Sequence, residues 1–449
     1  MLRVLIVVAA LVGLGALTYA RIVSQPLPRF NESHKPPSSR AARGAFHVHS
    51  DQSHDSSLSL DTIAQAAKDL GHQFVVLTDH NKQLAGTMIR QGIVLISGAE
   101  LSTPFGHLIS LDAHDVLGKE DRKKLDLHHA VKELGGIPIV AHPSDPKRPW
   151  EGTVAGANGI EITNFAASLR RKGGPVFVGL LPTLLAWKSS PALALAQIYD
   201  RDESALARWD GERGVDIAGY CGTNTHGRFD LGLSLSTWQL VLVRPIPDDP
   251  EAAAETIIAS LRAGTFHCAA GAFGTPRTID FHARTLTGQR VDVGAGGPVH
   301  NMASLHFEMP EVVGSATSTH LLRNGEEVLR HGGTKLTYPN PMPGTYRIEV
   351  RAVLPGVLWG DRVVPIVYTN RIRVRTEAEH AAWIAAQQPV GTEPGGDSEP
   401  VPQPAPEPVE GATEEDDEAP DPTPSESQGE LPKEPVGNEI PEPEESPSP

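Results

Sequence analysis

The chain of 449 residues contains very little cysteine, because only Cys221 and Cys268 occur. Two cysteines cannot form a disulfide framework, and their separation excludes a Cys-x-x-Cys metal site. If the protein is exported to an oxidising compartment, the two thiols could pair with each other. The alternative is that both are small buried residues near the ends of strands.

A basic surface is also missing. The formal charge is -16, but residues 391–449 contain 18 of the 55 acidic residues and one lysine, Lys433. The rest of the chain carries 37 acidic and 38 basic residues and is therefore close to neutral. Nucleic-acid-binding surfaces need clustered Lys and Arg, so we expect no nucleic-acid partner and disfavour a DNA-processing enzyme.

No internal apolar run is long enough to cross a membrane. The most apolar one, Pro175–Trp187, is closed by Lys188 and is expected to pack on the core as a helix or lid, with a membrane-touching surface as the alternative. At the N-terminus, Arg3 precedes an apolar run from Val4 to Ala20. This pattern is typical of a secretory signal, so residues 1–22 are interpreted as a cleaved signal peptide or an uncleaved membrane anchor. Both interpretations place the protein outside the cytoplasm, either periplasmic, secreted or anchored.

Four further regions follow. Residues 23–43 are polar and form a linker, and residues 44–275 alternate strand-like and helix-like stretches, which predicts a parallel α/β barrel. Residues 276–376 contain short alternating runs between Gly and Pro turns, as in a small antiparallel β-sandwich. Residues 377–449 begin with a short helix and continue as an acidic tail with 15 prolines from residue 391 onward. We expect this tail to be disordered, because it cannot bury enough apolar surface to offset its chain entropy.

Within residues 44–275, eight runs have strand character. They are Ala45–His49, Phe74–Leu77, Ile93–Ile96, His107–Leu111, Ile137–Ala141, Gly159–Thr163, Asp216–Tyr220 and Trp238–Val243. Helical patterns are predicted at Asp61–Ala67, at Leu125–Leu134 and from Pro250 to Arg262, and each is ended by glycine.

Seven short segments each end a run of apolar residues with a histidine, a carboxylate or both. They are Phe46–His49, Thr78–Asn81, Gly98–Glu100, Gly106–Leu108, Val140–Pro143, Gly159–Glu161 and Gly222–His226. In a parallel α/β barrel the C-terminal ends of the strands meet on the functional face. We therefore expect these segments to deliver metal ligands to one place. His47 and His49 lie two apart on one strand and should point to the same side.

These segments resemble the polymerase-and-histidinol-phosphatase (PHP) superfamily of metal-dependent phosphoesterases, and within it the CehA/McbA-type metallohydrolases. The resemblance covers about residues 44–275. The matching elements are His47-x-His49-Ser50, Ser53-His54-Asp55, Thr78-Asp79-His80-Asn81, Gly98–Ser102, Gly106-His107, Ala141-His142-Pro143 and Gly222–His226. Each motif alone is weak, but their order and spacing together are specific.

The resemblance implies a distorted (β/α)7 barrel with up to three metal ions and a small phosphorylated or ester substrate. The implied ligand sets are His47, His49, Glu100 and Asn224 for the first ion, Glu100, His107 and His142 for the second, and His80, His226 and either His54 or Asp55 for the third. Imidazoles with a few carboxylates suit zinc, manganese or iron. Two such ions about 3.5–4 Å apart could generate a hydroxide nucleophile.

Other residues have supporting roles in this interpretation. Asp79 would orient a ligand, Glu161 and Asn164 would line the pocket, and Arg228 could contact an anionic substrate or be an ordinary surface arginine. The chain departs from the family at Asn224, where the family pattern Gly-Ser-Asp-Ala-His has a carboxylate. Asparagine keeps a carbonyl oxygen but loses the negative charge, which weakens a site for a divalent ion.

Two functions of different classes follow from these features. The first is an exported metal-dependent hydrolase, a phosphoesterase that uses two or three metal ions and a metal-bound hydroxide. The second is a catalytically weak or inactive binding module, stabilised by metal, at the cell surface. Asn224 and the long tail motivate the second function.

Overall fold

The computed structural model describes residues 27–31, 41–124, 126–172, 186–187, 190–212, 217–227, 230–274, 276, 278–354 and 360–387, and short pieces between residues 6 and 20. Several predictions fall outside the described residues: Arg228, nearly all of 175–187, most of the N-terminal segment 1–22 and of the linker 23–43, and the tail 391–449. None of the helices in the described part is both long and apolar enough to span a membrane.

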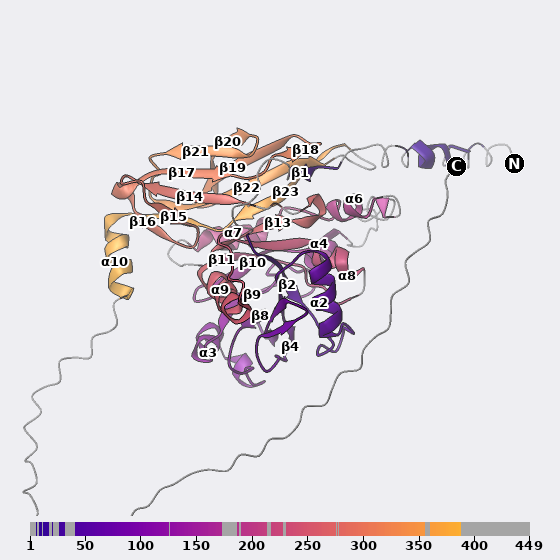
Figure 1. The fold of residues 1–449 in the computed structure, drawn as a ribbon, viewed down its shortest axis with the longest axis horizontal. Helices are drawn as coiled ribbons and strands as arrows, with labels where there is room; N and C mark the ends of the chain where they lie inside the picture. Colours follow the sequence, from indigo (N-terminus) through magenta and orange to yellow (C-terminus); the bar gives the residue numbers. More distant parts are fainter. Residues whose placement is uncertain are drawn as a thin grey trace, which may run out of the picture. The chain divides into compact units, whose positions relative to one another are not determined.

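The fold is mixed α/β and contains several sheets (Figure 1). One six-stranded sheet has the order β11-β10-β9-β8-β7-β4. Its strands are β4 (Asp79–His80), β7 (Gly98–Thr103), β8 (Gly106–Leu111), β9 (Ile137–Val140), β10 (Gly159–Asn164) and β11 (Ala218–Gly222).

A longer sheet of twelve strands joins the N-terminal and C-terminal parts of the folded chain. Its path is β16-β24-β22-β23-β13-β12-β2-β3-β6-β5, with β19 and β20 attached through β22. The bounds are β2 (Arg43–Val48), β3 (Phe74–Leu77), β5 (Met88–Arg90), β6 (Ile93–Ile96), β12 (Trp238–Leu242), β13 (Phe266–Ala270), β16 (Gly296–Pro298), β19 (Thr317–Arg323), β20 (Glu326–Gly332), β22 (Gly344–Leu354), β23 (Arg362–Thr369) and β24 (Ile372–Arg375).

The two sheets meet along β2. The Thr223 amide donates to the Phe46 carbonyl at 2.9 Å, and the His49 amide donates to the Thr225 carbonyl at 3.0 Å. On the other side, the Thr78 amide, between β3 and β4, donates to the Val48 carbonyl at 2.9 Å. The segments that follow β2, β3 and β11 therefore lie side by side.

The predicted parallel arrangement is only partly right. Strands β2, β3 and β6 are parallel to one another, as are β9, β10 and β11. Strand β8, however, runs antiparallel to both β7 and β9. Only Pro104 and Phe105 separate β7 from β8, whereas a parallel crossover needs a dozen residues or more.

Predicted and observed elements agree closely in several places. Strands β3 and β6 have the predicted bounds, and helices α2 (Leu60–Asp69) and α9 (Pro250–Ala263) cover the predicted helical patterns. Helix α3 (Leu127–Glu133) lies within the predicted range 125–134. Helix α9 begins after Asp249, whose side chain accepts from the Ala252 amide, and ends at Gly264 with a left-handed φ of 70°. Four further helices were not predicted from the sequence: α4 (Phe165–Lys172), α6 (Pro191–Ala196), α7 (Glu203–Gly211) and α8 (Leu231–Leu235).

The C-terminal part is rich in antiparallel strands, which Figure 1 shows in orange in one region of the fold. A separate antiparallel sheet has the order β15-β14-β17-β21, with β14 (Asp280–Thr285), β15 (Arg290–Asp292), β17 (Met302–Glu308) and β21 (Lys335–Pro339). Strand β23 pairs with β13, so one sheet continues across the expected boundary at residue 275. The remaining elements are β1 (Arg29–Phe30) with β18 (Val312–Val313), the final helix α10 (Glu377–Gln387), and the short 3-10 turns Asp121–Lys123, Gly271–Phe273 and Val299–Asn301.

Cys221 in β11 and Cys268 in β13 form a disulfide with a Cα–Cα distance of 5.9 Å. Both residues are buried, with exposed fractions of 0% and 1%. Of the two alternatives left open by the sequence, the structure has the paired one. The bond ties the strand that precedes Gly222–His226 to the middle of the long sheet.

Candidate metal centre

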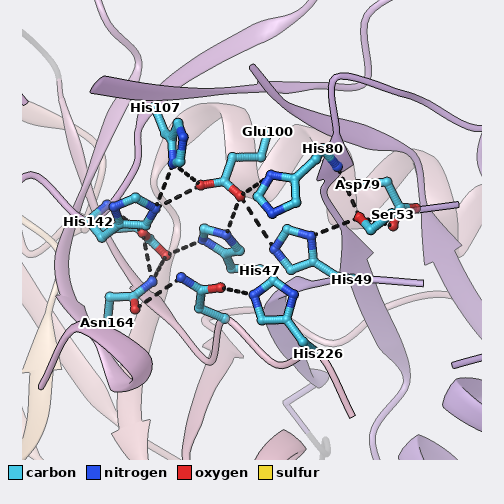
Figure 2. A network of polar contacts seen from close by, with 12 residues as sticks. His47, His49, Ser53, Asp79, His80, Glu100, His107, His142, Asn164 and His226 are labelled. Atoms are coloured by element: carbon cyan, nitrogen blue, oxygen red, sulfur yellow. Dashed lines mark hydrogen bonds and ion pairs between the residues drawn. The ribbon is translucent and has the colours of Figure 1, made fainter. Parts of the chain in front are cut away.

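Glu100, at the third position of β7, is the hub of a cluster of imidazoles (Figure 2). It is 1% exposed, and its Oε1 lies 2.8 Å from Nδ1 of His107 and 2.7 Å from Nε2 of His142. Its Oε2 faces three further ring nitrogens, at 3.4 Å for His47, 3.4 Å for His49 and 3.2 Å for His80. One carboxylate thus faces five histidines, which come from β2 and the residue after it, from β4, from the start of β8 and from the segment after β9.

Three groups of side chains in the described part bring their ligand atoms within 4.8 Å of one another. The groups are His47, His49 and Glu100; Glu100, His107 and His142; and His49, Asp55, His80 and His226. Glu100 belongs to two groups and His49 to two, so the groups are contiguous. This is the geometry expected of adjacent metal ions that share ligands.

Unusual backbone conformations help to aim these side chains. His47, His142 and Asn224 have φ angles of 67°, 24° and 50°, in the left-handed region that non-glycine residues seldom adopt. Such strain persists only where surrounding structure enforces it, and it is common at functional sites. A register shift in β2 between Ala45 and Val48 accompanies the strain at His47, and His47 and His49 still both face Glu100, as the sequence predicted.

Glu161 holds His47 and His142 in position through hydrogen bonds. It is fully buried, its Oε1 lies 2.9 Å from Nδ1 of His47, and its Oε2 accepts from the His142 amide at 2.6 Å. Asn164 Nδ2 donates to both Glu161 oxygens, at 3.1 and 3.0 Å. Because Glu161 occupies Nδ1 of His47, the ring presents Nε2 to the centre.

Asp79 contacts the cluster through two serines for which the sequence indicated no role. Its carboxylate accepts from the Ser50 amide and hydroxyl, both at 2.7 Å, and from the Ser53 hydroxyl at 2.9 Å. Ser53 Oγ lies 3.1 Å from Nδ1 of His49 (Figure 2). The expected orienting role of Asp79 therefore has a structural route, through Ser53 to His49.

The choice between His54 and Asp55 is clear in the geometry. Asp55 Oδ2 lies 3.2 Å from Nδ1 of His226 and 3.7 Å from Nε2 of His80. The His54 ring contacts the His80 ring, with centroids 5.2 Å apart, and His54 is in none of the three ligand groups. Of the two residues, Asp55 is thus the one whose carboxylate lies among the candidate ligand atoms.

Asn224 does not sit as a simple replacement for a carboxylate ligand. Its Oδ1 accepts a hydrogen bond from His226 Nε2 at 2.9 Å, and its Nδ2 donates to Asn164 Oδ1 at 3.4 Å. In this arrangement the His226 proton is on Nε2, and Nδ1 faces Asp55. The expected substrate contact, Arg228, lies outside the described residues.

The electrostatics favour an ionised carboxylate and neutral imidazoles at His49 and His226, but not at His47. Burial alone would lower the pKa of His47, but Glu161 and Glu100 raise it to about 10, so a metal ion has to displace that proton. Burial lowers the pKa of His226 to about 4 and that of His49 well below its usual value. Burial alone would raise the pKa of Glu100, but the charge of His47 and hydrogen bonds from His107 and His142 hold it well below normal. Neutral rings and an ionised carboxylate are the forms that bind metal.

The buried polar atoms also fit a metal. Nε2 of His47, Nε2 of His49 and Oε2 of Glu100 are buried and form no hydrogen bond within the described structure. Buried polar groups without partners are rare in folded proteins. A divalent cation between these atoms would satisfy all three, and the mixed imidazole and carboxylate donors suit zinc, manganese or iron.

Two arginines lie beside the candidate ligands and were not predicted as site residues from the sequence. Arg148 Nη1 lies 2.9 Å from Nε2 of His107, and the Arg122 guanidinium hydrogen-bonds to Asn81 Oδ1, next to His80. Arg148 follows Ala141-His142-Pro143 by only five residues, which is a signal that could have drawn attention to it. These guanidinium groups place positive charge beside the candidate ligands.

Comparisons with known proteins give little further information. No family model matches the chain, and no curated protein matches it. A solved two-domain protein from Bacteroides vulgatus, described as containing a predicted PHP-like metal-dependent phosphoesterase, is 13% identical with a TM-score of 0.36 and covers 76% of this chain and all of its own. An engineered protein is 12% identical with a TM-score of 0.14 and covers 68% of this chain and 49% of its own. Neither likeness is strong enough to assign a fold or an activity.

Proposed function

We propose that the chain is an exported, metal-dependent hydrolase of the PHP type, related to the CehA/McbA group, that cleaves phosphoesters. In this proposal β2, β3–β4 and β7–β11 form the distorted barrel, and two or three zinc, manganese or iron ions bind at the candidate centre. The observation that carries the proposal is the set of three contiguous ligand groups joined by Glu100 and His49.

In this proposal some side chains would bind the metal ions and others would orient the ligands. His47, His49, Asp55, His80, Glu100, His107, His142 and His226 would hold the ions. Glu161 and Ser53 keep Nδ1 of His47 and of His49 engaged, which leaves Nε2 of each ring for binding. Bound divalent ions would supply an activated water and would stabilise the charge that develops on the substrate.

An anionic substrate is supported by the two arginines. Arg148 lies against His107, and Arg122 lies against Asn81. A planar guanidinium is suited to the oxygens of a phosphoryl group. Arg122 lies in the 3-10 turn Asp121–Lys123 and Arg148 in the segment after β9, so the two would contact such a group from different parts of the chain.

Export is supported by the Cys221–Cys268 disulfide and by the signal-like N-terminal sequence. Disulfides persist in oxidising compartments and are rare in the cytosol. A periplasmic, secreted or membrane-anchored location is therefore part of the proposal.

The test is an assay of the purified full chain, loaded with zinc or manganese, against phosphate monoesters and diesters. We expect His49→Ala to lose both bound metal and hydrolysis. His129→Ala is the matched control, because His129 is 64% exposed and pairs only with Glu133 among the described residues. Full metal occupancy in His49→Ala would refute the site.

The alternative is a metal-stabilised binding module with little or no activity. It is favoured by Asn224, whose Oδ1 is engaged by His226 and which brings no negative charge to the centre. Tight metal binding without turnover of any phosphoester would select this alternative. Turnover that depends on Glu100 would exclude it.

A further inference from the structure

Asn224 is the main departure from the resembled sequence pattern, and the proposed function leaves it without a role. The residue is buried, and its backbone is left-handed with a φ of 50°, a conformation that asparagine tolerates better than most residues. Its side-chain amide lies between Asn164 and His226, at 3.4 and 2.9 Å. The direction of these two hydrogen bonds decides which nitrogen of His226 is left to bind a metal ion.

A backbone amide fixes the orientation of Asn164. The Ala167 amide, in the first turn of α4, can only donate, and Asn164 Oδ1 accepts from it at 3.0 Å. Nδ2 of the same side chain donates to both oxygens of Glu161. A flipped Asn164 would face donor with donor at Ala167 and acceptor with acceptor at Glu161. Only one orientation is therefore compatible with its neighbours.

The orientation of Asn224 follows from that of Asn164. Because Asn164 presents an oxygen, Asn224 turns its Nδ2 toward it and its own Oδ1 toward Nε2 of His226 (Figure 2). An amide oxygen can only accept, so Nε2 of His226 carries the ring proton. The chain of contacts Ala167–Asn164–Asn224–His226, here called the amide relay, thus links the proton position on a candidate ligand to the start of α4.

The His226 ring is also held so that its other nitrogen faces a ligand group. It stacks on the His49 ring, with centroids 4.0 Å apart and planes 14° apart. Nδ1 is buried, forms no hydrogen bond within the described part of the chain, and lies 3.2 Å from Asp55 Oδ2. With the proton on Nε2, a nitrogen lone pair and a carboxylate oxygen face each other. A cation between them would replace this repulsion by two ligand contacts.

The competing tautomer has the proton on Nδ1, where His226 would donate it to Asp55 and could not bind metal through that nitrogen. In this tautomer the lone pair of Nε2 would face the lone pairs of Asn224 Oδ1. Asn224 cannot remove this contact by flipping, because its oxygen would then face Asn164 Oδ1. The amide relay therefore disfavours the tautomer that excludes a metal ion.

We propose that Asn164 and Asn224 are positioning residues that fix the tautomer of His226 and leave its Nδ1 free for the ion held with Asp55 and His80. In place of a charged ligand, residue 224 supplies the group that orients one. The amide relay serves the metal centre of the proposed function and rests on it in that sense, but the proton position can be measured without metal.

The test locates the His226 proton by nitrogen-15 NMR of the full chain labelled in histidine, first after removal of metal with a chelator and then with zinc. Comparison with His226→Gln identifies the signals of this ring. In the wild type we expect the proton on Nε2 in both states, and zinc on Nδ1. A chelator-buffered zinc titration gives the affinity of the same chain.

Three variants separate the members of the amide relay. Asn224→Gly removes the side chain without straining the left-handed backbone. In the metal-free variant the His226 proton should move to Nδ1, toward Asp55, and zinc affinity at this group should fall about 10–100-fold. Asn224→Asp keeps an acceptor at Nε2 and should retain the wild-type tautomer. Asn164→Leu does not contact the ring, yet it should shift the proton as Asn224→Gly does, because it allows Asn224 to flip.

Asn324→Gly is the matched control. Asn324 also has a left-handed φ, of 53°, and its Oδ1 accepts from the Thr345 amide at 2.9 Å. It belongs to none of the three ligand groups. Its replacement should change neither the tautomer of His226 nor the zinc affinity.

The role of the amide relay is overturned if the wild-type His226 ring carries its proton on Nδ1 in either state. It is also overturned if Asn224→Gly or Asn164→Leu keeps the wild-type tautomer. A wild-type chain that has the proton on Nε2 but binds no zinc would refute the proposed hydrolase, and the variants would still show that the two asparagines set the tautomer.

Discussion

The molecule buries charged groups in two places, and the cost of removing these charges from water is offset differently in each. At the candidate metal centre, one carboxylate, Glu100, faces five imidazoles, and several buried ligand atoms have no hydrogen-bond partner. In β22, Arg347 is paired with Asp210 on one side and with Glu349 on the other. The first region is incomplete without a cation, and the second is nearly self-sufficient. Buried polar atoms without partners thus distinguish a cluster that can bind a ligand from an ion-paired cluster that stabilises the fold.

The largest effect should come from Glu100→Gln. This change removes the negative charge that two ligand groups share. Both metal content and kcat/KM should fall, by more than the roughly 10–100-fold typical of losing a residue that only supports a ligand. Elemental analysis and steady-state kinetics on the same preparation measure both. Normal metal content in this variant would mean that Glu100 is not a ligand.

Arg347→Met tests the other side of the comparison. It removes the bidentate partner of the half-buried Asp210 and one of the three arginine partners of the buried Glu349. The free energy of unfolding should fall by about 3–5 kcal/mol, as for other broken buried ion pairs. Urea denaturation measures this, and metal stoichiometry of the folded variant should stay unchanged. Arg330→Met, at an exposed pair, should shift stability by no more than about 0.5 kcal/mol.

Replacing both Cys221 and Cys268 with alanine removes the tie between β11 and β13. The disulfide closes a separation of 47 residues, so its loss should lower the free energy of unfolding by about 2–4 kcal/mol. Thermal unfolding with and without reductant checks this. The wild type should approach the variant under reduction, and identical curves for all samples would show that the bond contributes nothing.

Glu161→Gln should weaken metal affinity about 10–100-fold, because Glu161 orients His47 and the His142 backbone without facing the centre itself. Competition against a chromogenic chelator gives the affinity. The free energy of unfolding should change much less than in Arg347→Met. This difference separates a residue that orients a metal ligand from one that stabilises the fold. An affinity equal to that of the wild type would remove Glu161 from this role.

The smallest effect is expected for Asn224→Asp. A carboxylate beside His226 and His49 should raise metal affinity, since hard divalent ions favour negative oxygen donors. The gain should be modest, roughly tenfold or less, because the present Asn224 Oδ1 is already committed to His226. An unchanged metal titration would mean that residue 224 has no contact with the ion.

Part of the fold could be predicted because its signals are local. The apolar runs of β3 and β6, and the Asp249 cap and Gly264 stop of α9, depend on neighbouring residues alone. The antiparallel direction of β8 was missed although the two-residue connection at Pro104–Phe105 was visible. The partners of β22 and β23 could not be read from sequence, because strand pairing across long separations leaves no local pattern.

The sequence by itself determined which residues are candidates for metal binding, since histidines and carboxylates at strand ends follow from composition and periodicity. Only the tertiary structure decided how they share Glu100, that Asp55 and not His54 faces His226, and that Asn224 engages His226. It alone also paired Cys221 with Cys268. The type of ligand atom is a property of a single residue. The distances between ligand atoms, their burial and the hydrogen bonds that they already form depend on segments far apart in the chain.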